Sequence, residues 1–284
     1  MLLGFFTGAS LFLAGFLWAR LDLSFWSIPL IFLGSWLAML LAAFVFLCVV
    51  CAFADIRKPQ HEDSPFYRRI MYVYIELIMQ LVGLKTEVAG LEQTPKSGRF
   101  LLVCNHQSEA DPGVLHHYFQ TSQLAFISKK ENATMPFVGK FMHKTLCQMV
   151  NRENDREALK SIVKSIQLVK EDKVSMGVFP EGGILVKDKL SHFRSGVFKI
   201  AQKANVPIVV CTLKGTSDVL PRLKKLKGTK VRLHLVGVIP TWELEGKTTV
   251  EIADRVYHMM LEDLGEEYRI DTDTLPPAET EVTT

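Results

Sequence analysis

Two long apolar runs without a charged residue constrain the fold of this chain more than any other feature. Residues 1–19 carry no charge, Arg20 and Asp22 interrupt the run, and residues 23–54 are again uncharged. A helix needs about 20 apolar residues to cross a bilayer, a length that the first run just reaches and the second exceeds. We therefore predict a two-helix membrane hairpin anchor over residues 1–60, with residues 20–26 as its connector.

The residues that flank the two runs indicate how such a hairpin is inserted. Neither a basic segment before the first run nor a small-residue cleavage site before the second supports a signal peptide. Trp18 and Trp26 lie beside the connector, as interfacial aromatic residues do. Four basic residues follow the second run and predict that the rest of the chain faces the cytoplasm from the inner or cell membrane: Arg57, Lys58, Arg68 and Arg69. Spanning and monotopic insertion both remain open.

Residues 61–270 have the length and patterning of one α/β domain. Short apolar segments predict buried strands at 100–104, 124–127, 174–179, 208–213 and 231–235. Helical spacing predicts helices at 66–84, 155–169, 197–204 and 250–264, with Asp155 as the N-cap of the second. Strands that alternate with helices are typical of a mostly parallel central sheet flanked by helices. The polar, acidic residues 271–284 are predicted to be a disordered tail.

Charge and cysteine usage exclude some functions. The 33 basic and 30 acidic residues leave a net charge of only +3, and no nucleic-acid-binding motif is present, so no nucleic-acid partner is expected. The five cysteines are scattered and predict free thiols in a reducing compartment. Cys48 and Cys51 form a CxxC motif, but inside an apolar helix they lack the polar setting that a thiolate site needs.

A histidine and an aspartate follow the predicted strand at 100–104, where the sequence reads NHQSEADP over residues 105–112. Active sites of α/β folds lie at the carboxyl ends of strands. A turn between His106 and Asp111 can bring the carboxylate to one imidazole nitrogen, which leaves the other nitrogen to accept a proton from a hydroxyl. The alternative is structural, because Asp111 and Pro112 also suit an N-cap and first helical residue. The two roles of Asp111 do not exclude each other.

A second polar element follows the predicted strand at 174–179, where residues 179–183 read FPEGG. Adjacent glycines allow the backbone to approach a ligand closely, and Glu181 can orient a hydroxyl or a cationic side chain. A tight strand-to-helix turn without a binding role would use the same residues. On the residues alone, both interpretations stand.

Three basic side chains occur at predicted strand and helix ends: Lys129, Arg152 and Arg194. Arginine binds phosphate through two parallel hydrogen bonds, and the start of a helix adds free N–H groups. Taken singly, each of these side chains is an ordinary surface charge. Their shared placement makes them candidates for substrate binding.

Two further chemistries are less compatible with the sequence. His116 and His117 are adjacent, and neighbouring residues of a helix point in different directions and rarely bind one metal ion. Cys104 precedes His106 by two residues, but its place in a buried strand is expected to raise the pKa of its thiol. No GxSxG segment is present that would indicate a serine nucleophile.

The order of these motifs resembles the glycerolipid acyltransferases of the PlsC type, the 1-acylglycerol-3-phosphate acyltransferases. Residues 105–111 are similar to the family's NHxxxxD motif and residues 179–182 to its FPEG motif. The second block is similar to KKE at residues 129–131 with Pro136, Phe137 and Gly139, and ends at Arg152. FRSG at 193–196 is similar to the FKxG element, and VPI at 206–208 to the last block. The resemblance covers about residues 85–240.

This resemblance implies that His106 is the general base and Asp111 its orienting partner. It implies that Arg152, Glu181, Gly182 and Arg194 line the acceptor site, with charge from Lys129. The implied reaction moves an acyl chain from acyl-CoA or acyl carrier protein to the hydroxyl of a lysophospholipid, foremost lysophosphatidate, at the lipid bilayer. The family forms no acyl-enzyme intermediate and uses no metal and no cofactor beyond the acyl donor.

One departure from the family pattern bears on the acceptor. The family usually reads EGTR where this chain reads Glu181-Gly182-Gly183-Ile184. Because that arginine is a candidate phosphate contact, glycerol-3-phosphate, another lysophospholipid or an aminolipid remains an alternative acceptor. The alternative of a different class is a non-catalytic membrane lipid-binding protein, which would not need a base with an orienting partner.

Overall fold

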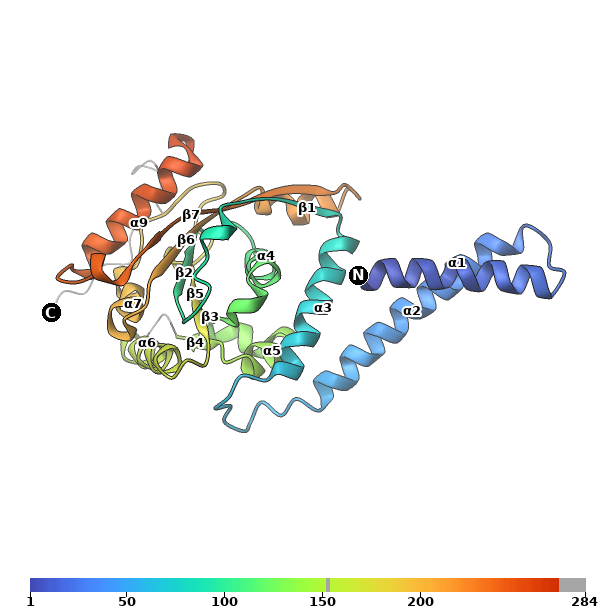
Figure 1. The fold of residues 1–284 in the computed structure, drawn as a ribbon, viewed down its shortest axis with the longest axis horizontal. Helices are drawn as coiled ribbons and strands as arrows, with labels where there is room; N and C mark the ends of the chain where they lie inside the picture. Colours follow the sequence, from blue (N-terminus) through green and yellow to red (C-terminus); the bar gives the residue numbers. More distant parts are fainter. Residues whose placement is uncertain (152–153, 271–284) are drawn as a thin grey trace. The chain divides into compact units, whose positions relative to one another are not determined.

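The computed structural model describes residues 1–151 and 154–270 (Figure 1). Contacts divide the chain into two compact units. The first comprises Met1–Leu81 and Glu131–Leu146, and the second Val82–Lys130 and Cys147–Thr284. Arg152 and the predicted tail at 271–284 lie outside the described residues.

The first unit begins with the two predicted apolar helices, α1 (Leu2–Arg20) and α2 (Ser27–Ala52). Both are long and apolar enough to cross a membrane. Many of their large apolar side chains remain exposed, as in Phe12, which is 75% exposed, and Leu30, which is 72% exposed. The uncharged runs therefore form two long helices with exposed apolar surface.

The remainder of the first unit packs α3 (Pro65–Leu81) and α5 (Val138–Lys144) around a small apolar core. Its buried members are Cys51, Met71 and Phe141. The prediction extended α3 to residue 84, but the helix ends at Leu81. Gly83 follows with a φ of 65°, a left-handed conformation that glycine adopts without strain and that stops a helix.

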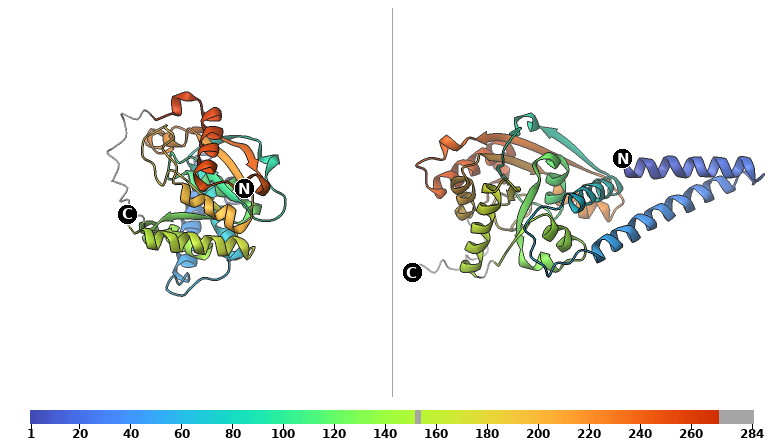
Figure 2. Two further views of the ribbon diagram at one scale, coloured as in Figure 1. Left: turned by 90° about the vertical axis from the view of Figure 1, so that its left-hand side faces the viewer. Right: turned by 60° about the horizontal axis from the view of Figure 1, so that its bottom comes forward.

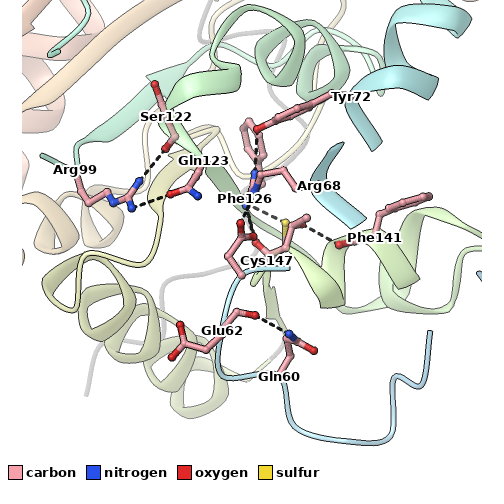
Figure 3. A network of polar contacts seen from close by, with 12 residues as sticks. Gln60, Glu62, Arg68, Tyr72, Arg99, Ser122, Gln123, Phe126, Phe141 and Cys147 are labelled. Atoms are coloured by element: carbon pink, nitrogen blue, oxygen red, sulfur yellow. Dashed lines mark hydrogen bonds and ion pairs between the residues drawn. The ribbon is translucent and has the colours of Figure 1, made fainter. Parts of the chain in front are cut away.

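A buried arginine ties α3 to its surroundings. The guanidinium of Arg68, only 4% exposed, donates to both carboxylate oxygens of Asp63 at 2.8 and 2.7 Å. It also donates to the Tyr72 hydroxyl at 3.2 Å and to the Thr145 carbonyl at 3.3 Å (Figure 3). The planar, two-pronged geometry of arginine is required here, because a single ammonium group cannot reach all of these acceptors.

Replacing Arg68 with lysine is therefore expected to lower the free energy of unfolding by about 2 kcal/mol, because buried acceptors lose charge-assisted hydrogen bonds. Denaturant unfolding in detergent measures this loss. The neighbouring Arg69 is exposed, so Arg69→Lys is the matched control and should unfold like the wild type. Equal stability of the two variants would contradict the assigned role of Arg68.

The second unit is built on one seven-stranded sheet with the order β1-β7-β6-β2-β5-β3-β4. Its strands are β1 (Leu84–Ala89), β2 (Leu101–Cys104), β3 (Leu124–Lys129), β4 (Gln148–Val150), β5 (Ser175–Val178), β6 (Ile208–Lys214) and β7 (Thr229–Ile239). β6 and β7 are antiparallel, and every other neighbouring pair is parallel. The predicted mostly parallel sheet is confirmed.

Helices cover both faces of this sheet. They are α4 (Asp111–Tyr118), α6 (Asp155–Lys170), α7 (Lys199–Ala204), α8 (Val219–Leu223) and α9 (Thr249–Leu264). Figures 1 and 2 show α6, α7 and α9 on one face and α4 on the other. β2 and β5 are buried along their whole length because they lie inside the sheet and are covered on both sides.

Two strands and one helix cap differ from the prediction. β1 and β4 were not predicted, because both are edge strands with mostly exposed or half-buried side chains and lack a continuous apolar run. The N-cap of α6 is Asn154, whose side chain accepts from the Glu157 N–H at 3.1 Å, and not Asp155. Either residue type caps a helix well, so sequence preference alone did not distinguish these neighbours.

The topology brings the two predicted polar loops together. β2 and β5 are parallel neighbours, so their carboxyl ends lie at the same edge of the sheet. The loop after β2 carries His106, and the loop after β5 carries Glu181. The two motifs, 75 residues apart in the chain, thus meet at one edge.

Candidate active site

The predicted contact between His106 and Asp111 is present. The imidazole Nδ1 of His106 lies 2.9 Å from an Asp111 carboxylate oxygen, Oδ2. The Asp111 side chain is fully buried, and that of His106 is 18% exposed. A buried carboxylate at this distance orients the imidazole.

Asp111 is held in place by its own loop. Besides His106, its Oδ2 accepts from the backbone N–H groups of Gln107 at 2.6 Å and Ser108 at 2.8 Å. These donors precede Asp111, whereas an N-cap carboxylate accepts from residues that follow it. Asp111 is the first residue of α4, and Ala110 occupies the cap position without a side-chain cap bond. Its carboxylate therefore closes the loop around His106, and the capping alternative is wrong.

An aromatic ring fixes the other side of the histidine. The rings of His106 and Phe179 stack with centroids 4.1 Å apart and an interplanar angle of 17°. Phe179 in turn stacks on Phe126 of β3 at 5.6 Å. Stacking and the Asp111 contact together restrict rotation of the imidazole. Among the residues that the structure describes, none forms a hydrogen bond with His106 Nε2, the nitrogen that a substrate hydroxyl would approach.

Glu181 joins the two loops. Its carboxylate is buried, and its two oxygens accept from the backbone N–H of His106 at 2.7 Å and of Ser191 at 2.8 Å. Burial raises the pKa of Glu181 to about 7, although the N–H groups of Ser191 and His106 oppose the shift. The negative charge of Asp111 adds to it. The structure thus places Glu181 as a bridge that positions the His106 backbone.

This raised pKa predicts a pH-dependent contribution to stability. The pKa of Glu181 in the folded protein, about 7, lies above its ordinary value of 4.5. The folded state therefore binds this proton more tightly than the unfolded state does. The contribution is complete below about pH 4.5 and is lost as the pH rises through about 7, amounting to roughly 3 kcal/mol.

Glu181→Gln removes this titration, so the free energy of unfolding of the wild type, relative to that of the variant, should fall by roughly 3 kcal/mol from pH 4.5 to pH 8. Denaturant unfolding across this range measures the difference. The exposed Glu109 provides the control, and Glu109→Gln should leave the pH profile unchanged. A Glu181→Gln difference that is constant with pH would show that Glu181 does not titrate as described.

Gly182 and Arg194 form a contact beside Glu181. Gly182 has a φ of 78°, and a Cβ atom at this position would lie 2.7 Å from Nε of Arg194. The backbone N–H of Arg194 donates to the Pro180 carbonyl at 2.8 Å. Arg194 is exposed, and no acidic side chain in the described part of the chain pairs with it. The missing side chain of Gly182 therefore leaves room for the Arg194 guanidinium.

The other two predicted basic residues are less defined. Lys129 is the last residue of β3 and is exposed at the same edge of the sheet, but no hydrogen bond or ion pair in the described part of the chain links it to His106, Glu181 or Arg194. Arg152 follows β4 and lies outside the described residues. The structure therefore brings together five of the seven predicted site residues: His106, Asp111, Glu181, Gly182 and Arg194.

Asn105 is a positioning residue to which the sequence interpretation gave no role. It is buried, its amide donates to the Leu213 carbonyl at 2.9 Å, and its carbonyl accepts from the Leu213 N–H at 2.7 Å. These paired bonds attach the start of the His106 loop to β6. A polar residue directly after a buried strand is the signal that could have indicated this, because a buried amide needs partners.

The alternative chemistries do not match the geometry. In the described ranges 1–151 and 154–270, no group of three His, Cys, Asp or Glu side chains is arranged to hold a metal ion. His116 packs edge-on against Phe126, and His117 packs edge-on against Tyr118, so the two imidazoles lie against different aromatic rings. Cys104 is fully buried, and burial raises the pKa of its thiol well above the ordinary range, as predicted.

Comparisons with known proteins agree with this site. Residues 85–214 match the family model described as Acyltransferase. The chain is 28% identical to the 1-acyl-sn-glycerol-3-phosphate acyltransferase of Saccharomyces cerevisiae, over 77% of this chain and 72% of that protein. It is 34% identical to a Chlamydomonas reinhardtii protein of the same name, over 50% of this chain and 42% of that protein.

A solved structure has the same fold. The 1-acyl-sn-glycerophosphate (LPA) acyltransferase PlsC from Thermotoga maritima superposes with a TM-score of 0.62 at 22% identity, covering 82% of this chain and 97% of that one. An oriented histidine–carboxylate pair at the carboxyl edge of a parallel sheet has the geometry of a general base with its orienting partner. With these matches, residues 85–214 resemble the acyltransferase family, and the chain shares the fold of the PlsC structure.

Proposed function

We propose that this enzyme transfers an acyl chain from an acyl thioester to the free hydroxyl of lysophosphatidate and so makes phosphatidate for phospholipid synthesis. The observation that carries the proposal is the His106–Asp111 pair, with Nδ1 held at 2.9 Å by a buried carboxylate and Nε2 left free. The activity is the one for which the yeast relative is named.

His106 and Asp111 act as base and orienting partner in this reaction. Nε2 of His106 removes the proton of the acceptor hydroxyl while its oxygen attacks the thioester carbonyl. The C–O bond forms, the C–S bond breaks, and the proton passes to the departing thiol. Asp111 stabilises the transient imidazolium, which is why its burial and its 2.9 Å contact matter. The acyl donor is acyl-CoA or acyl carrier protein, and the cycle needs no metal and no further cofactor.

The acceptor phosphate is assigned to the basic side chains at this edge. Arg194 is free of acidic partners in the described chain and is held beside Gly182, and Lys129 and Arg152 follow neighbouring strands. Guanidinium groups bind phosphate through paired hydrogen bonds. Glu181 supports the site by holding the His106 backbone.

A second acceptor class is supported by the loop after Gly182. Ile184 is 43% exposed and Leu185 is 55% exposed, so apolar side chains face solvent where the family usually has an arginine that is a candidate phosphate contact. Such a surface suits glycerol-3-phosphate poorly and a lysophospholipid or aminolipid with a larger head group better. The chemistry at His106 would be unchanged.

The apolar helices supply the location for this chemistry. We assign residues 1–60 to the membrane, residues 61–270 to the acyltransferase domain and residues 271–284 to a tail. We assign the domain to the cytoplasmic side of the inner or cell membrane, an orientation that the basic residues after α2 support. Lipid substrates then reach the site from the bilayer.

An acceptor panel tests the proposal. The purified full-length protein is incubated with radiolabelled acyl-CoA or acyl carrier protein and with lysophosphatidate, glycerol-3-phosphate, lysophosphatidylethanolamine or an aminolipid. Phosphatidate from lysophosphatidate should be the dominant product. Acylation of another acceptor without phosphatidate formation would assign the second class. Absence of any acyl transfer, with a folded protein, would support lipid binding without catalysis.

A further inference from the structure

A basic surface lies on the second unit, on elements other than the loops that carry His106 and Glu181. It is formed by the start of β1 and by α8 with the turn that leads into β7. We call it the basic loop surface, and it comprises Lys85, Arg222, Lys224, Lys225, Leu226, Lys227 and Lys230.

The charge of this surface is not balanced by the protein. Residues 219–230 include five basic and no acidic residues. The acidic residue that precedes them, Asp218, is paired with Lys187 at 3.2 Å. No ion pair links the six cations of the basic loop surface to an acidic side chain in the described part of the chain. A cluster of this kind attracts an anionic partner.

Two lysines of the surface face each other directly. Lys85 of β1 and Lys230 of β7 are register partners in parallel strands, so their side chains leave the same face of the sheet. Like charges placed directly opposite each other destabilise a strand pair. The two lysines, together with Arg222, line a recess of about 330 Å³ whose other walls include Gly83 and Gly228. A phosphate group in this recess would relieve the repulsion.

The recess has a rigid floor. The Thr229 N–H donates to the Gly83 carbonyl at 3.2 Å, and a Cβ atom on Gly228 would lie 2.7 Å from the same oxygen. Nε of Arg222 donates to the Gly228 carbonyl at 2.8 Å, so the guanidinium is fixed at the rim. The cations are thus presented by an ordered turn.

The turn also presents an apolar side chain to solvent. Leu226 is 93% exposed and has a φ of 53°, an unfavourable conformation for leucine. Two hydrogen bonds hold this conformation. The Leu226 N–H donates to the Leu223 carbonyl at 2.9 Å, and the Lys227 N–H donates to the Arg222 carbonyl at 3.0 Å. Leu220 is also 56% exposed. A strained residue that holds an apolar tip outward among lysines indicates a surface-binding function.

From this combination we infer that the basic loop surface docks on an anionic phospholipid bilayer, with Leu226 inserted among the lipids and a lipid phosphate in the Lys85–Arg222–Lys230 recess. Apolar side chains flanked by flexible lysines bind lipid interfaces because burial and charge attraction add. An acidic protein would need a matching apolar pocket and fixed ion pairs, whereas a fluid bilayer needs neither. Docking would be a second membrane contact besides α1 and α2.

Hydrogen exchange on the full-length protein in nanodiscs tests this inference without relying on catalysis. Discs of phosphatidylcholine alone are compared with discs that contain phosphatidylglycerol. The amides of residues 219–230 should exchange more slowly in the anionic discs, and high salt should remove the difference. The variant carrying Lys224→Gln, Lys225→Gln and Lys227→Gln should lose it, because three cations are expected to contribute about 100-fold to docking.

The control has the same charge change at three other exposed lysines of α6 and α7: Lys160→Gln, Lys170→Gln and Lys203→Gln. It should keep the lipid-dependent protection. Equal exchange in both disc types would overturn the inference. Protection that appears only when an acidic acyl carrier protein is added would overturn it as well and assign the surface to a protein partner. Acyl transfer can fail or succeed independently of either result.

Discussion

Replacing His106 with alanine is expected to lower kcat by about a thousandfold or more, because general-base catalysis by a positioned side chain contributes about 10²- to 10⁴-fold. Nε2 of His106 has no protein partner in the described chain, whereas Nδ1 is held by Asp111, so alanine removes the base itself. Acceptor and donor contacts elsewhere are retained. KM should therefore change much less than kcat.

Initial rates with saturating acyl donor and acceptor measure this effect. The exposed histidine of α9, His258, is 54% exposed and far along the chain from the loops, so His258→Ala is the matched control. Circular dichroism and unfolding curves show whether His106→Ala remains folded despite the loss of the Phe179 stack. A folded His106→Ala variant with nearly wild-type kcat would refute the catalytic assignment.

Asp111→Asn is expected to lower kcat by about 10²- to 10⁴-fold while the loop keeps its shape. The asparagine oxygen can still accept one of the backbone N–H groups that Asp111 now binds at 2.6 and 2.8 Å. It carries no charge, so the imidazolium that forms during the reaction loses its stabilisation. The buried position, 0% exposed, leaves no water to replace that charge.

A double-mutant cycle separates this role from a purely structural one. If Asp111 acts through the imidazole, Asp111→Asn added to His106→Ala should reduce the rate little further. Multiplicative losses would instead indicate that Asp111 matters only for folding of the loop. Asp111→Glu provides a second test, since its longer side chain cannot occupy the same closed turn and should also be impaired.

Local sequence patterns were sufficient for much of the fold. Uncharged runs predicted α1 and α2 because lipid-exposed helices need apolar side chains along their whole length. Buried strands such as β2 and β6 were predictable because strands covered on both faces are continuously apolar. Edge strands β1 and β4 were not, because their exposed sides carry ordinary polar residues.

The candidate site likewise has contacts that the sequence predicted and contacts that it did not. The spacing of His106 and Asp111 predicted their contact, since a five-residue turn can bring the two side chains together. The same residues left a capping role for Asp111 open. Only the tertiary structure showed that its carboxylate accepts from the backbone N–H of Gln107, which precedes it in the loop. The roles of Asn105 and Phe179 depend on β6 and on ring stacking across strands, which no local pattern encodes.

By itself, the sequence determined an α/β enzyme with two apolar helices and a histidine–aspartate pair, because these features rest on short-range spacing and side-chain polarity. Only the tertiary structure decided that the pair is buried on one side and open at Nε2. It also decided that Glu181, 75 residues away, holds the His106 backbone. The reason is physical: pairing of β2 with β5 places distant loops at one edge, and burial there raises the pKa of Glu181.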